Sequence, residues 1–246
     1  MVVYKSIIPF SLILCFSILS YAQQNGKAYY TKKSSHNFLP IKKSDNSTTA
    51  NSLYKSVNSG ISGMEFILTF NNTLANYKDI KKIGIDENSS EAQFSKVFSG
   101  YSGPYYYDFE RKSVTRKQGK YLIKKQLSSY EWVLTKEKLI INDLTCYKAT
   151  TILKLDGRSG EILRPVVAWY TTDINLSAGP DGFGGLPGLI MQLEVNKVVT
   201  TLKKIEFSDK PLEINLPTKG KKMTEAEFDA LMKDINEDRG KYYDKN

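Results

Sequence analysis

The chain has little histidine and little cysteine, and this scarcity excludes several kinds of active site. Its 246 residues contain one histidine, His36, and two cysteines, Cys15 and Cys146. A Ser-His-Asp or Cys-His site needs an imidazole to move the proton, and the usual zinc sites need three or four histidine and cysteine ligands. We therefore expect no histidine-based hydrolysis, and we predict neither a metal site nor a cofactor.

Long hydrophobic runs are confined to the N-terminus. There, Lys5 precedes an uncharged apolar run from Ile7 to Leu19, and Ser20 and Ala22 form a small-x-small pair. This pattern is typical of a secretory signal peptide, and the run is too short to span a bilayer as a helix. We predict cleavage after Ala22, export from the cytoplasm and no transmembrane segment in the remaining chain.

Removal of Cys15 with the signal peptide leaves Cys146 as the last cysteine, so an intramolecular disulfide is excluded. Cys146 lies in the apolar, β-branched stretch IINDLTCYKATTILKL. A cysteine in such a stretch usually acts as a small buried hydrophobic residue, and a reactive thiol is the alternative.

The formal net charge is +9, but the lysines that produce it are scattered in pairs along the chain. Such a distribution favours a solvated basic surface over a dedicated anion-binding stripe. Because we also expect export, no nucleic-acid partner is predicted.

The chain divides into three segments: the signal peptide over residues 1–22, a polar N-terminal arm over 23–59, and a single domain over 60–246. The arm is rich in Ser, Asn, Thr and Lys, which cannot bury much apolar surface. The domain begins with GMEFILTF, where apolar residues alternate from Met64 to Phe70. Further short strands are expected in GPYYYDF, SVTRK, KYLIKKQL, YEWVLT and KLIIND.

Two hairpins and a helix complete the expected architecture. CYKATTILKL and EILRPVVAWYTT flank the turn DGRSG, and LIMQLEV and VVTTLKKIEF flank Asn196-Lys197. Pro165 requires its strand to be at an edge or bulged, because it cannot donate a ladder hydrogen bond. Thr224 and Glu227 have the spacing of a capping box and precede the apolar stripe Phe228, Leu231, Met232 and Ile235, with Gly240 as the expected stop. The predicted class is mainly β (α+β), a curved antiparallel sheet or half-barrel with a C-terminal helix that docks on it.

Between these hairpins lies SAGPDGFGGLPGLI, a loop dense in glycine. It lacks both phosphate-binding patterns, G-x-x-x-x-G-K-[ST] and G-x-G-x-x-G, and it leads into a strand, so no helix N-terminus is available for an anion. We interpret it as a tight, packed crossover that fixes the next strand under or beside Trp169. A ligand rim or partner-docking loop is the alternative.

The loop resembles the motif that names the GLPGLI family of exported bacterial proteins. GGLPGLI carries the resemblance, together with CYKATT, VVAWYTTDINLSAGP and KKMTEAEF, over about residues 132–228. The resemblance implies a place outside the inner membrane of a diderm cell, periplasmic, outer-membrane-associated or secreted, and no established activity. The motif residues, structural or at a ligand rim, are Gly179, Pro180, Gly184, Gly185, Leu186, Pro187, Gly188, Leu189 and Ile190.

Two functions remain open, and an enzyme ranks third. The favoured one is a non-enzymatic binding or carrier protein of the cell envelope, with an apolar ligand in a cavity lined by GMEFILTF, VVAWYTT and LIMQLEV. Its candidate groove residues are Trp169, Tyr170, Phe183 and Cys146. A filled interior would count against it. The alternative is an accessory module of an envelope or outer-membrane protein complex, with an exposed apolar patch near Phe183 or the tyrosines of GPYYYDF.

Overall fold

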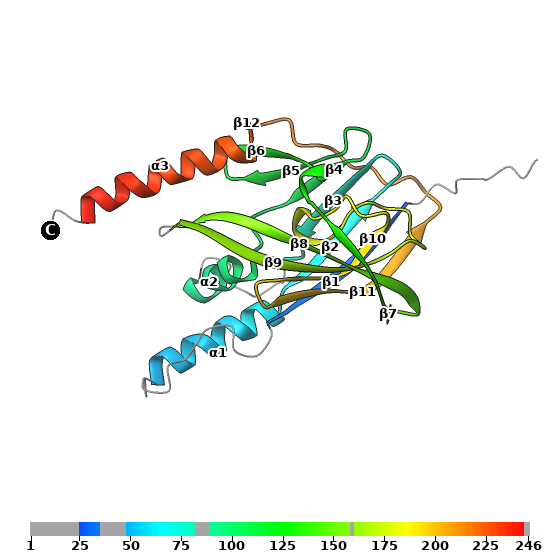
Figure 1. The fold of residues 1–246 in the computed structure, drawn as a ribbon, viewed down its shortest axis with the longest axis horizontal. Helices are drawn as coiled ribbons and strands as arrows, with labels where there is room; N and C mark the ends of the chain where they lie inside the picture. Colours follow the sequence, from blue (N-terminus) through cyan, green and yellow to red (C-terminus); the bar gives the residue numbers. More distant parts are fainter. Residues whose placement is uncertain (1–24, 35–47, 82–88, 158–159, 244–246) are drawn as a thin grey trace, which may run out of the picture.

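The computed structural model describes residues 25–34, 48–81, 89–157 and 160–243, and in them it forms one open 12-stranded sheet with three α-helices (Figure 1). The strands are β1 (Asn25–Ser34), β2 (Glu65–Phe70), β3 (Leu74–Asp79), β4 (Tyr105–Asp108), β5 (Ser113–Gln118), β6 (Tyr121–Gln126), β7 (Val133–Ile141), β8 (Leu144–Gly157), β9 (Gly160–Thr171), β10 (Leu189–Val195), β11 (Val198–Ser208) and β12 (Lys221–Thr224). The helices are α1 (Thr48–Ser62), α2 (Ser90–Ser99) and α3 (Glu225–Tyr243), with short 3-10 turns η1 (Leu127–Ser129) and η2 (Pro180–Gly182). None of the described helices is both long and apolar enough to cross a membrane.

The strand order is β12-β6-β5-β4-β3-β2-β1-β11-β10-β9-β8-β7. Every neighbouring pair is antiparallel except β12 and β6, which are parallel. The sheet is strongly curved. The curvature is evident from a hydrogen bond that Tyr107 on β4 donates to the connection between β9 and β10, which is far away in the strand order. The predicted class, a mainly β fold with an antiparallel sheet and a C-terminal helix, is confirmed.

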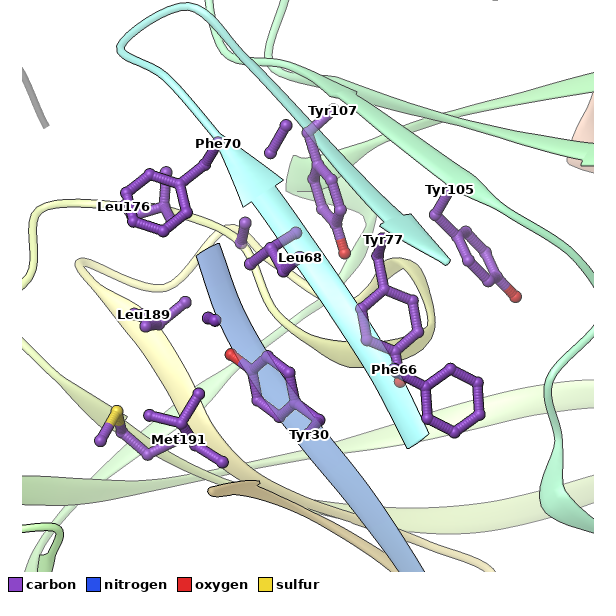
Figure 2. Packing of buried hydrophobic residues seen from close by; sticks show 14 of the residues in the cluster. Tyr30, Phe66, Leu68, Phe70, Tyr77, Tyr105, Tyr107, Leu176, Leu189 and Met191 are labelled. Atoms are coloured by element: carbon purple, nitrogen blue, oxygen red, sulfur yellow. The ribbon is translucent and has the colours of Figure 1, made fainter. Parts of the chain in front are cut away.

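The main core lies inside this curve and is rich in tyrosine. Figure 2 shows Tyr30, Tyr77 and Tyr107 projecting from β1, β3 and β4 into one cluster with Leu68 and Leu189. All five side chains are almost completely buried. The alternation predicted for GMEFILTF is confirmed, since Phe66, Leu68 and Phe70 of β2 are buried while the residues between them are not.

Both predicted hairpins are present. β8 pairs with β9 from Tyr147–Tyr170 to the turn, and β10 pairs with β11 around Asn196 and Lys197. These two turn residues have φ values of 49° and 65°, as a type I′ turn requires. Pairing of β9 with β10 begins at Val166, directly after Pro165, so the proline lies where β9 has an open edge on that side.

The N-terminal part of the chain differs from the predicted polar arm. Residues 25–34 form β1, which lies between β2 and β11 in the middle of the sheet, and residues 48–62 form α1. The composition concealed β1 because its inward positions include Lys32 beside Ala28 and Tyr30. The predicted signal peptide and His36 lie outside the described residues.

The helices and two strands also required correction. No helix was expected before the C-terminus, yet α1 and α2 form and pack together, with Ser95 Oγ donating to the Val57 carbonyl at 3.4 Å. Strand β3 was not predicted, and YEWVLT and KLIIND form one bulged strand, β7, not two.

The C-terminal helix begins as predicted. The Glu227 amide donates to Thr224 Oγ1 at 3.2 Å and the Thr224 amide donates to Glu227 Oε2 at 2.7 Å, which is a capping box. Phe228 is buried against Tyr121. Beyond this first turn α3 extends away from the sheet (Figure 1), and it continues through Gly240 to Tyr243, so the predicted stop and the predicted docking along the stripe are wrong.

Cys146 is fully buried in the main core, which confirms its predicted structural environment. Burial raises the pKa of its thiol to about 11. At this pKa only about one thiol in a thousand is ionised at about pH 8, and the thiolate is the reactive form.

In a chain carrying Cys15→Ser, we expect a chromogenic disulfide reagent to label Cys146 only after unfolding in urea, measured by absorbance. Labelling of the native protein as fast as that of the unfolded chain would contradict a buried thiol.

Candidate functional site

The glycine-rich loop, residues 177–188, connects two strands that are neighbours in the sheet. It links β9 to β10, which pair antiparallel with Trp169 opposite Gln192, so β10 lies beside Trp169 but the connection is not a crossover. The approach to the loop places Ile174 and Leu176 in the main core. Its second half places Phe183 and Leu186 in a second core against β8, β9 and β10. The loop is therefore packed on both sides.

Aromatic side chains from other elements hold the carbonyl groups of this loop and of the start of β10. A loop without regular pairing must find partners for its buried carbonyls elsewhere, because an unmade hydrogen bond is costly. The donors are Tyr107 Oη to Gly179 O at 2.7 Å and to Phe183 O at 3.0 Å, Tyr30 Oη to Ile190 O at 2.9 Å, Tyr130 Oη to Gly182 O at 3.2 Å, and Trp132 Nε1 to Gly184 O at 2.9 Å.

Two of the glycines are required by close approach as well as by backbone conformation. Gly182 has φ 82°, and a Cβ there would lie 2.5 Å from the ring of Tyr105. Gly188 has φ 154°, and a Cβ there would lie 1.8 Å from the carbonyl oxygen of Thr171. Any side chain at these positions would displace the loop from the strands beneath it.

A buried ion pair fastens the same loop to β1. Lys32 Nζ lies 2.7 Å from Asp181 Oδ2, and the Lys32 side chain is completely buried. Its ammonium also donates to the Ser99 carbonyl at 2.9 Å and lies 4.9 Å from the centre of the Phe66 ring. Burial lowers the pKa of Lys32, and the adjacent Asp181 carboxylate opposes that shift. Asp181 adopts φ 53°, a left-handed conformation that is uncommon outside glycine.

Tyrosine hydroxyls surround this ion pair. Burial raises the pKa of Tyr77, Tyr101, Tyr105 and Tyr130, and the negative charge of Asp181 raises each of them further. These phenols therefore remain neutral and do not supply a phenolate nucleophile. Within the described chain, Tyr77 Oη and Asp181 Oδ1 are both buried and have no hydrogen-bond partner.

A pocket of about 480 Å³ lies beside the loop, and Asp181 and Phe183 contribute to its lining. One side comes from β4–β6 and the segment that follows, with Tyr105, Arg116 and Tyr130. Another side comes from the outer part of the β8–β9 hairpin, residues 151–157 and 160–165, which is called the arm from here on and is distinct from the predicted N-terminal arm. In the described chain the arm pairs only with itself, because β7 begins opposite Thr150 and β10 ends opposite Val166. The C-terminal end of α2 and the β10–β11 turn complete the lining.

The lining combines charged and apolar groups. Arg116 donates to Glu225 Oε1 at 3.1 Å and to Ser102 Oγ at 2.9 Å. Lys125 Nζ lies 4.3 Å from the centre of the Tyr130 ring, and Tyr130 stacks on Phe183 with 4.8 Å between ring centres. The volume falls within the range of about 300–1,000 Å³ that is usual for small-molecule sites. No cluster of three metal-ligating side chains occurs among the described residues.

The four predicted groove residues do not share one groove. Cys146 belongs to the main core, and Trp169 packs against it. Tyr170 and Phe183 belong to the second core on the other face of β9, because successive side chains of a strand point to opposite faces. The cavity expected between GMEFILTF, VVAWYTT and LIMQLEV is filled by these cores. Of the four residues, Phe183 lines the pocket.

Little in the sequence indicates which residues form the ion pair and the pocket. Lys32 shares the alternation of Ala28 and Tyr30, which is the one local signal that it points inward. Arg116 and Lys125 lie in the neighbouring strands β5 and β6, whereas Arg164 lies in β9, far away both in the sequence and in the strand order. The curvature of the sheet brings Arg164 to the same pocket.

Comparison with known proteins identifies a short matching segment. A family model described as "Protein of unknown function (Porph_ging)" matches residues 158–192, which include Gly184 to Ile190. No curated protein matches the chain.

Solved structures offer low similarity. Two structures of PNGF-II are 15% and 13% identical, with TM-scores of 0.47 and 0.49; they cover 77% and 83% of this chain, which spans only 28% and 32% of theirs. LprF from Mycobacterium bovis is 13% identical over 80% of this chain and 90% of its own, with a TM-score of 0.26. At these scores nothing is carried over from these proteins to this chain.

Substitution of Gly188 by alanine tests the close approach of the loop to β9. We expect Gly188→Ala to lower the free energy of unfolding by about 3 kcal/mol or more, from the overpacking and the backbone strain together. Gly119→Ala is the matched control, since Gly119 also has a positive φ but its Cβ would meet no atom within 4 Å. Urea denaturation followed by tryptophan fluorescence measures both variants. Equal losses would mean that only the backbone conformation, and not the contact, requires glycine.

A double-mutant comparison tests the Lys32–Asp181 pair. Lys32→Met leaves a buried carboxylate without its counter-charge, which should cost about 3–5 kcal/mol. Adding Asp181→Asn, which removes the stranded charge and tolerates the left-handed backbone, should recover part of that loss. The free energies of unfolding of both single variants and the double variant are compared at neutral pH. Strictly additive losses would show that the two side chains do not interact.

Proposed function

We propose that this protein is exported and acts as a non-enzymatic binding protein of the cell envelope, with its ligand in the pocket between the glycine-rich loop and the arm. The observation that carries the proposal is the pocket itself, about 480 Å³, whose lining brings charged, aromatic and aliphatic side chains from distant parts of the chain together. Its walls come from β4–β6, α2, the arm and the loop, so they are held by the whole fold.

The composition of the lining also favours binding over catalysis. The acidic side chains of the pocket, Asp181 and Glu225, are each engaged with a cation, Lys32 and Arg116. The tyrosines around it are held neutral by burial, and Cys146 lies in the main core. What remains is a polar and aromatic surface that can contact a small molecule.

Blocking the pocket should remove a molecule that accompanies the protein. We expect a native mass spectrum of protein purified from the envelope fraction of its own cells to show a reproducible excess of small-molecule size. Leu155→Trp, which places an indole on the pocket side of the arm, should abolish the excess. Ile152→Trp is the matched control, because Ile152 is exposed on the other face of the same strand.

The folding of both variants is checked by thermal melting. A bare mass for the unchanged protein, or an excess that persists in Leu155→Trp, would refute stable binding at this pocket.

A second candidate function, an accessory module of an envelope complex, is favoured by one observation. An exposed patch was expected near Phe183 or the GPYYYDF tyrosines, but Phe183, Tyr105 and Tyr107 are buried, and Tyr106 is partly buried. The edge strand β7 instead exposes large apolar side chains: Val133, Leu134, Leu139 and Ile140. Edge strands of this kind can pair with another chain. A co-purifying protein in the same mass spectrum would support this function.

A further inference from the structure

Two cations of the pocket have no acidic partner in the described part of the chain. Lys125 on β6 and Arg164 on β9 both line the pocket, and neither lies within salt-bridge distance of a described carboxylate. They therefore differ from Arg116 in the same pocket and from Lys32 beside it, each of which pairs with a carboxylate.

The surroundings of Lys125 show that its charge is poorly compensated. Its ammonium lies over the face of Tyr130, and the same side chain is half-buried. Burial lowers the pKa of Lys125, while the more remote carboxylates of Glu225 and Asp229 raise it. A partly desolvated ammonium of this kind gains most from a bound anion, because charge-assisted hydrogen bonds are about twice as strong as neutral ones.

Apolar side chains line the pocket beside Arg164 and at the end of α2. Leu153 and Leu155 face the pocket from the arm, on the same face of the hairpin as Arg164. Val97 and Phe98 approach from the end of α2. Val97 is 74% exposed, so its side chain is accessible to a ligand in the pocket.

Building on the proposed binding function, we propose that the ligand is an anionic amphiphile, whose acidic head group is held by Lys125 and Arg164 and whose short apolar tail lies along the arm and the end of α2. Phosphate and carboxylate head groups share this chemistry, since both accept charge-assisted hydrogen bonds from an ammonium and a guanidinium. The head group decides orientation, and burial of the tail contributes most of the affinity.

Four probes separate the contributions of head and tail. Octyl phosphate and octanoate carry both; inorganic phosphate carries only the anion; octyltrimethylammonium carries the tail with the opposite charge. Isothermal titration calorimetry on the full protein stripped of any co-purifying molecule, below the micelle concentration of each probe, should show binding of one or both anionic amphiphiles. Inorganic phosphate and octyltrimethylammonium should each bind at least about tenfold more weakly.

Variants locate the head group. Lys125→Met and Arg164→Met retain much of the apolar stem of each side chain, and each should weaken binding of the better anionic probe about tenfold, as the loss of one charge-assisted hydrogen bond implies. Lys124→Met and Lys154→Met are the matched controls. Both lysines are exposed, and each directly precedes a pocket residue of its strand, Lys125 or Leu155, so its side chain points to the other face. Binding should therefore change less than about twofold.

The outcomes distinguish the ligand class from the binding function. Tight binding of octyltrimethylammonium, or equal binding by all four methionine variants, would overturn the anionic head group. Binding of inorganic phosphate as tight as that of octyl phosphate would overturn the tail and indicate a free anion. If no probe binds while the native mass spectrum still shows an excess that Leu155→Trp removes, the ligand class is wrong and the binding function stands. If the mass is also bare, both proposals fail.

Discussion

The fold depends on the hydrogen bonds that tyrosine and tryptophan side chains donate to the carbonyls of the glycine-rich loop and the strand after it. A loop of this length cannot satisfy its buried backbone by itself, and an unpaired carbonyl in a core is costly. The donors come from β1, from β4 and from the segment before β7, which are distant along the sheet. The carbonyls of the loop can therefore reach their donors only if the sheet curves, and the space inside the curved sheet is filled only if the loop is present.

The Lys32–Asp181 pair adds specificity to this arrangement more than stability. Removing two charges from water is expensive, and a buried pair often recovers no more than that cost. A single position and geometry satisfies both groups, however, because Lys32 also needs the Ser99 carbonyl and Asp181 needs a left-handed backbone. The pair thus fixes which part of the loop lies at the pocket, and it links β1, the end of α2 and the loop in one contact.

Local patterns predicted the elements that depend on neighbouring residues. The alternation in GMEFILTF, the turn at Asn196-Lys197 and the capping box of Thr224 and Glu227 all rely on contacts within a few residues, and the structure contains them. Strand β1 and helix α2 were missed because their stability comes from distant partners. Lys32 is acceptable inside a sheet only because Asp181 lies opposite, and α2 has a weak apolar face that packs on α1. No local rule contains that information.

The same distinction separates the loop from the pocket. The motif from Gly184 to Ile190 could be recognised because its glycines and prolines are constrained by their own backbone, and the structure assigns most of its side chains to packing. The groups available to a ligand, such as Lys125 and Leu155, stand outside that motif on strands whose proximity is set by curvature. A chain that kept the loop and its donors could change these groups without losing the fold. Two proteins that share this loop are therefore expected to share the curved sheet that supports it, while the ligand must be inferred from the pocket of each protein.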